Sequence, residues 1–199
     1  MMQAVTIRDE WHTVLAALSG VELLQSWEWG EFKSRHGWVP QRWTWKYEGE
    51  VLAAAQMLLR SETRFGLSAS IAYVPRGPLL DWTDADLRRR VLHDMCSLAC
   101  REGALFLKID PHVAVGYGVT GSTEAQPVAL GLNLADELAS GGWRESRQQV
   151  QFRNTVVLDL AQDESVLLAS FRQKTRYNVR LAMRKGVPVR AGTDSDIGL

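Results

Sequence analysis

Two neighbouring strand-like stretches constrain the fold more than any other feature of the chain. They are "QRWTWKY" (41–47) and "VLAAAQMLL" (51–59), joined by "EGE". The first alternates apolar and polar residues, as a half-buried strand does, whereas the second alternates less clearly. A short connection that contains glycine is typical of a β-hairpin, so we expect these stretches to pair antiparallel. Trp43 and Trp45 then share one strand face, and we expect both in the core.

Helix and strand patterns alternate around this hairpin. Apolar residues at helical spacing, with capping residues before them and glycines after them, predict helices over 9–20, 26–37, 83–101 and 132–139. Strands are expected over 4–7, 68–74 and 104–109, the last of them buried. Thr83 and Asp86 form a predicted capping pair for the third helix. The pattern predicts a mixed α/β (α+β) fold whose first strands are largely antiparallel.

The last 49 residues form a separate segment of the pattern. They contain a strand-like "RNTVVLDL" (153–160), a long helix opened by Asp163 or Glu164, and a strand-like "VPVRA" (187–191). We place a domain boundary near residue 150, giving domains 1–150 and 151–199. About 50 residues cannot bury their own apolar face. Either this segment packs on the first domain, or the sequence is a shortened piece.

Composition limits the class of protein. The 199 residues are 46% hydrophobic and carry 23 basic and 23 acidic side chains, so any basic site must be local. No apolar run reaches the roughly 18 residues of a membrane-spanning helix, and the first residues lack a signal-peptide pattern. We expect a cytosolic protein, or one that works at the inner face of the membrane.

A row of arginines is the most unusual local feature. The stretch "FRQKTRYNVRLAMRKG" (171–186) has six basic residues and no acidic one, and its arginines recur every fourth residue at 172, 176, 180 and 184. The row can be a solvated helix face paired with acids elsewhere in the chain. It can also bind phosphate, because the guanidinium fork matches phosphate oxygens. Nucleic acid is a third interpretation, and the spacing alone leaves all three open.

Five stretches together resemble the FemABX family of peptidoglycan bridge-forming aminoacyltransferases. They are "LLQSWEWGEFKSRHGW", "YVPRGPLLD", "LKIDP", "NTVVLDL" and "FRQKTRYNVRLAMRKGVPV", in this order between residues 23 and 189. The resemblance implies a GNAT-like mixed sheet flanked by helices over 1–150. It also implies the incomplete beginning of a second GNAT-like domain over 151–199.

The resemblance also implies a reaction and its partners. Aminoacyl-tRNA would donate an amino acid to an amine on the peptide stem of a UDP-linked or lipid-linked muropeptide. Peripheral association with the inner membrane is compatible with a lipid-linked substrate, and the oligomeric state stays open. Because family members continue well past residue 199, the resemblance leaves open that this chain alone has no activity.

Site residues follow from the same resemblance. Lys33 and Arg176 match positions associated with the precursor's phosphates, and Arg172 and Arg180 are candidate helpers. Lys33 lies four residues after Trp29, whose ring can pack on the lysine stem. The alternative is a lysine whose charge simply favours the negative end of the helix dipole. Tyr73 is expected to orient the muropeptide, although a core tyrosine fits its position equally well.

Two aspartates are the candidates for a catalytic role. Asp81 can act as a base or simply precede a helix, and the second interpretation is favoured. Asp110, followed by proline at a strand end, is typical of a turn. The aminoacyl-tRNA donor that the resemblance implies is already an activated ester. Proximity of the two substrates can then lower the activation barrier by about 7–11 kcal/mol, and no strong base is required.

No cofactor or metal is expected. The sequence has no acetyl-CoA signature, and Cys96 and Cys100 fit small buried hydrophobes better than metal ligands. An acyl-CoA-dependent N-acyltransferase of polysaccharide modification and a non-catalytic anion-binding module remain the alternative functions.

Overall fold

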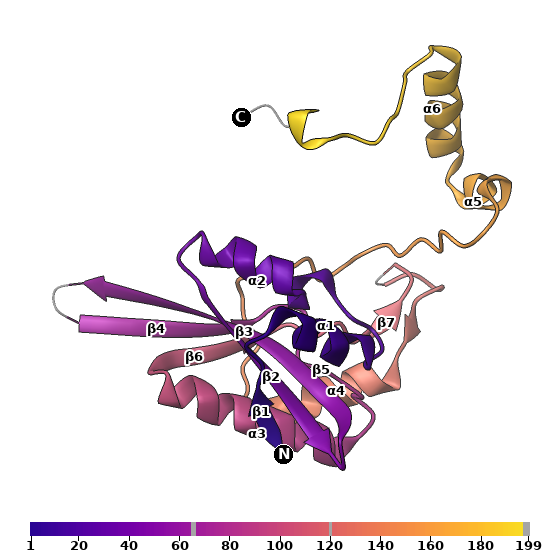
Figure 1. Ribbon diagram of the computed structural model, residues 1–199. Coiled ribbons are helices and arrows are strands. Elements are labelled where there is room, and N and C mark those ends of the chain that lie inside the picture. Colours follow the sequence, from indigo (N-terminus) through magenta and orange to yellow (C-terminus); the bar gives the residue numbers. More distant parts are fainter. Residues whose placement is uncertain (65–66, 120, 197–199) are drawn as a thin grey trace. The chain divides into compact units, whose positions relative to one another are not determined.

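The chain divides into two units in the computed structural model, which describes residues 1–64, 67–119 and 121–196. The first unit is Met1–Gln151 and the second is Phe152–Leu199. Figure 1 shows the elements of each unit.

A mixed sheet forms the centre of the first unit. Its strands are β1 (Met2–Ala4), β2 (Val39–Tyr47), β3 (Glu50–Arg64), β4 (Leu67–Val74), β5 (Leu79–Leu80) and β6 (Ala104–Ile109). The order is β1-β2-β3-β4-β6, with β5 paired to β3; only β4 and β6 are parallel. The predicted hairpin is confirmed, with Tyr47 opposite Glu50. Gly49 supplies the positive φ (89°) that its tight turn requires.

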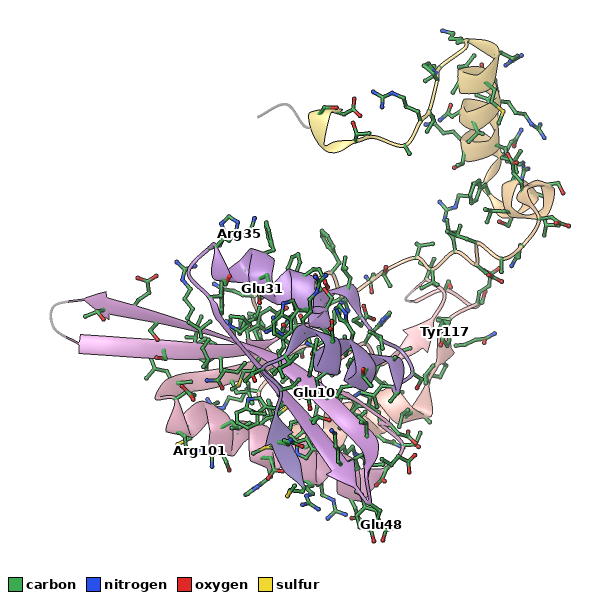
Figure 2. All side chains as sticks on the ribbon, viewed as in Figure 1. Glu10, Glu31, Arg35, Glu48, Arg101 and Tyr117 are labelled. Carbon is green, nitrogen blue, oxygen red and sulfur yellow. The ribbon has the colours of Figure 1, made fainter. Side chains whose placement is uncertain are left out.

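Helices cover both faces of this sheet, and the predicted α/β fold class is confirmed. The helices of the first unit are α1 (Arg8–Ala16), η1 (Leu23–Gln25), α2 (Trp27–Ser34), α3 (Ala85–Arg101) and α4 (Ala129–Ser140). A small ribbon of β7 (Gly116–Tyr117) and β8 (Gln126–Pro127) precedes α4. Figure 2 shows Arg101, the last residue of α3, and Glu31 of α2 on opposite sides of the sheet.

The sheet faces bury two apolar clusters. Against α3, Trp45 and Met57 pack with Val91 and Met95, and Trp43 is partly buried beside them, as expected for both tryptophans. On the other face, Trp11 of α1 packs with the β3 and β5 residues Ala54 and Leu79.

Three buried polar side chains join the helices to the sheet. The Gln25 amide donates to the Pro75 carbonyl at 2.5 Å, and its oxygen accepts the Gln56 N–H at 2.6 Å. The Gln56 side chain donates to the Ser26 carbonyl at 2.9 Å and accepts from Arg42 Nε at 2.8 Å. These bonds connect the start of α2, β2, β3 and the turn after β4.

Several local predictions for the first unit are wrong. The N-cap of α3 is Asp84, which accepts the N–H groups of residues 86 and 87, because the Thr83 hydroxyl donates to Asp81 instead. The strand β6 is not buried: Leu105 and Phe106 are exposed because, in the described part of the chain, β6 pairs only with β4.

Both cysteines are exposed rather than buried. The buried side of α3 consists of Val91, Leu92, Met95, Leu98 and Ala99, and Cys96 and Cys100 lie at the edge of this stripe.

The second unit contains α5 (Glu164–Ser170), α6 (Gln173–Arg184) and η2 (Asp194–Asp196). The single long helix that we predicted is interrupted, because Phe171 and Arg172 are extended (ψ 151° and 148°). At this corner Arg176 donates to the carbonyls of Ala169 at 2.9 Å and Phe171 at 2.5 Å, which satisfies acceptors at the end of α5.

The strands predicted at 153–160 and 187–191 are absent from the described residues. A strand needs a neighbouring strand for its backbone hydrogen bonds, and among the described residues neither segment has one. Val156 and Val157 are consequently 84% and 78% exposed. Among the described helices, none combines the length and apolar character that crossing a bilayer requires.

Replacement of Gly30 in α2 tests the buried polar network. A Cβ at this position would lie 2.3 Å from Arg42 Nη2 and 2.3 Å from Gln56 Oε1. We therefore expect Gly30→Ala to lower the free energy of unfolding by about 1–3 kcal/mol in urea denaturation. Helix propensity alone predicts a gain of about 1 kcal/mol, so a stabilised variant would contradict the described packing.

Candidate functional site

Tyr73 and Asp110 meet at the carboxyl-terminal ends of the parallel strands β4 and β6. The Tyr73 hydroxyl donates to Asp110 Oδ2 at 2.7 Å, and the Arg76 backbone N–H donates to Oδ1 at 2.6 Å. Gln151 Nε2 lies 3.4 Å from the Tyr73 hydroxyl. Ligands of open α/β sheets bind beyond the carboxyl ends of strands, so this edge is a candidate site.

Burial sets the protonation of this pair. It raises the pKa of Asp110 above its ordinary value, and the bonds from Tyr73 and the Arg76 N–H offset only part of that rise. Burial, and then the bond to Asp110, raise the pKa of Tyr73, so the phenol stays protonated at neutral pH. The carboxyl of Asp110 is therefore a stronger base than an exposed aspartate, and Tyr73 holds one of its oxygens.

Lys33 lies near the end of α2 between two indole rings. Its ammonium is 5.8 Å from the Trp29 ring centroid, which confirms the expected contact, and 5.4 Å from that of Trp38. Arg60 approaches the same Trp38 ring at 5.9 Å. Within the described residues Lys33 has no carboxylate within ion-pair distance. The indoles hold this charge by cation–π attraction and leave it uncompensated.

Strand register puts Tyr73 on the same sheet face as α2. Gln56, Leu58 and Arg60 alternate along one face of β3, and Gln56 bonds the residue that caps α2. Tyr73 is opposite Leu58, so its side chain shares that face. The structure thus brings Tyr73 and Asp110 together and places Lys33 on the helix that covers the same face.

Asp81 has a local structural role in the described contacts. Its Oδ1 accepts the Thr83 N–H at 2.9 Å and the Thr83 hydroxyl at 2.7 Å, and these bonds lower the pKa of Asp81. This geometry matches the favoured interpretation of a residue that precedes a helix. Its catalytic role stays an untested prediction, as do the roles of the other predicted site residues.

The arginine row belongs to the second unit. Arg176, Arg180 and Arg184 line an open hollow along α6, and Arg172 stands at the helix N-cap. In the part of the chain that the structure describes, none of the four pairs with a carboxylate. Because Lys33 and Arg176 lie in different units, their expected convergence on one ligand stays a prediction.

Sequence reasoning missed Trp38, Arg60 and a histidine–carboxylate pair. Alternation with Gln56 along β3 is the signal that could have identified Arg60. His112 Nδ1 lies 2.5 Å from Glu22 Oε1, a contact between distant segments that no local pattern indicates. No group of three or more His, Cys, Asp or Glu side chains in the described ranges could hold a metal.

Comparison with solved structures defines the fold class first. The chain superposes on the crystal structure of FemX with a TM-score of 0.73 and 23% identity, over 97% of this chain and 46% of FemX. The two proteins therefore share a fold.

Sequence comparison then gives the family. The model of the FemAB family matches residues 8–198, and the chain belongs to this family. It is 30% identical over 170 residues to the lipid II:glycine glycyltransferase of Staphylococcus aureus. That match covers 84% of this chain and 38% of the relative, so the chain spans well under half the length of the curated relatives it matches.

Removal of the Tyr73 hydroxyl tests the site's electrostatics. Because its hydrogen bond lowers the pKa of Asp110, Tyr73→Phe should move the Asp110 titration to higher pH in carboxyl carbon NMR. Asp81, whose pKa depends on Thr83, is the internal control. An Asp110 titration that is unchanged or shifted to lower pH would contradict the described bond.

The same titration has a consequence for stability. A folded-state pKa above the unfolded value of about 3.9 means that the native state binds its proton more tightly. The resulting stabilisation is fully present below that unfolded pKa and is lost as pH rises through the folded pKa. We expect urea denaturation to show this loss in the wild type and not in Asp110→Asn. The difference between the two curves of stability against pH then gives the contribution of Asp110.

Proposed function

We propose that the chain is part of an aminoacyltransferase of peptidoglycan precursors. The amino acid moves from aminoacyl-tRNA to an amine on the peptide stem. The observation that carries the proposal is the 30% identity, over 84% of this chain, to a lipid II:glycine glycyltransferase. Membership of the FemAB family supports it.

Lys33 contacts the precursor's diphosphate in this proposal. An ammonium between two indoles, with no carboxylate partner among the described residues, is partly desolvated and uncompensated. A phosphate oxygen can supply the missing negative charge through a charge-assisted hydrogen bond. Both UDP-linked and lipid-linked precursors carry this diphosphate, and a lipid-linked one would bring the protein to the inner face of the membrane.

Tyr73 and Asp110 act on the acceptor amine. The stem amine is protonated in solution and must lose one proton before its lone pair attacks the ester carbonyl. The raised pKa of Asp110 favours transfer of that proton to the carboxylate, while Tyr73 keeps the carboxylate oriented. The nitrogen of the tetrahedral intermediate then loses its second proton to water, and the bond to the tRNA oxygen breaks as that oxygen takes up the proton held by Asp110 and leaves as a hydroxyl.

Calorimetric titration with a UDP-muropeptide tests the role of Lys33. Lys33→Ala should raise the dissociation constant about 10- to 100-fold, since a hydrogen bond to a charged group contributes about 1.5–3 kcal/mol. Lys46→Ala is the matched control, because Lys46 lies on β2 of the same unit and its ammonium is 3.9 Å from Glu10 Oε1. Equal affinities of wild type and Lys33→Ala would refute the role.

Thermal denaturation of the same samples distinguishes the proposed function from an acyl-CoA-dependent acyltransferase. Thermal stabilisation by the UDP-muropeptide and none by acetyl-CoA is expected. Stabilisation by acetyl-CoA alone would favour an acyl-CoA-dependent acyltransferase instead.

A further inference from the structure

Charge is divided unequally between the two units. The second unit has eight Arg and Lys residues and five Asp and Glu residues, a net charge of +3 in a chain whose total is zero. Such asymmetry between parts of a chain is typical of proteins that bind a polyanion. Helix α6 carries four of these eight basic residues and no acidic one, and its two capping residues, Arg172 and Lys185, are basic as well.

One side of α6 gathers arginines around an aromatic ring. We call this surface the arginine face; it consists of Gln173, Arg176, Tyr177, Arg180, Met183 and Arg184, which line one open hollow. Tyr177 is 56% exposed, and Arg180 and Arg184 are exposed. In the described part of the chain, neither arginine has a carboxylate partner, and Arg176 is the one that bonds backbone carbonyls.

The length of the arginine face favours an extended ligand. Arginines four residues apart are about 6 Å apart along a helix axis, and α6 with its 12 residues is about 18 Å long. Two cations suffice for one diphosphate, so the face continues beyond what a diphosphate can contact. A repeating phosphate backbone can contact the whole row.

We propose that the arginine face of α6 binds the RNA of the aminoacyl-tRNA donor. Arg180 and Arg184 contact successive phosphates, and Tyr177 stacks on an unpaired base. Exposed aromatic rings set among basic side chains are how proteins hold single-stranded nucleic acid. The identity of the RNA rests on the proposed function; the polyanion site rests on α6 itself. Arg180, a candidate helper at the diphosphate, is thereby assigned to the donor.

Fluorescence anisotropy with an RNA minihelix that ends in single-stranded CCA tests the proposal. The double variant Arg180→Gln/Arg184→Gln should weaken binding about tenfold at low salt. It should also reduce the slope of log K against log[salt] by about 1.5, because two phosphate contacts are lost. Tyr177→Leu should weaken binding about tenfold, with an unchanged slope. Glutamine is a good helix former, and circular dichroism checks that α6 persists.

Arg190→Gln is the matched control. It removes one positive charge from the same unit, but Arg190 lies outside α6 and pairs with Asp196 at 2.5 Å. We expect it to leave the RNA affinity within twofold of wild type. An equal loss in this control would mean that net charge, rather than the arginine face, binds RNA, and would overturn the proposal.

Two further outcomes separate this proposal from the proposed function. Loss of UDP-muropeptide affinity in the double variant, with RNA affinity intact, would overturn the RNA assignment in favour of the diphosphate. Absence of RNA binding by the wild type would also overturn it. Lys33→Ala should not change RNA binding, so failure of the Lys33 titration counts against the precursor site alone.

Discussion

The hydrogen bonds of Gln25 and Gln56 constrain the rest of the first unit. Both side chains are fully buried, and a buried amide left without partners costs about 1–3 kcal/mol for each group. Their bonds reach the start of α2, the turn after β4 and the neighbouring strand β2 at once. Helix α2, which carries Lys33, is therefore held on the sheet face to which the Tyr73 side chain belongs.

The two units present positive charge in physically different ways. Lys33 is a single ammonium whose environment consists largely of indole rings, which suits one compact anionic group. The arginine face of α6 is solvent-exposed and repetitive, which suits a long polyanion and makes binding sensitive to salt. The proposed function joins an RNA-borne donor to a diphosphate-bearing acceptor and therefore needs both kinds of site; in that proposal Lys33 serves the diphosphate and the arginine face serves the RNA.

Much of the first unit could be predicted from sequence because its elements are defined locally. The strands β2 and β3 and the buried stripe of α3 follow from residue periodicity and turn chemistry. The break before α6 could not be predicted, because its helical spacing continues through Phe171, which is extended. The contact of Lys33 with Trp29 follows from helical spacing, whereas its contact with Trp38 and the bond between Tyr73 and Asp110 depend on tertiary packing.

The central claim is that the α2 side of the sheet receives the precursor. The indole N–H signals in a proton–nitrogen NMR spectrum report on it directly, since Trp29 and Trp38 flank Lys33, while Trp45 bonds Asp94 of α3 on the opposite face. On addition of UDP-muropeptide, the account predicts shifts of the Trp29 and Trp38 signals and none of Trp45. A spectrum in which Trp45 moves, and the other two do not, would contradict it.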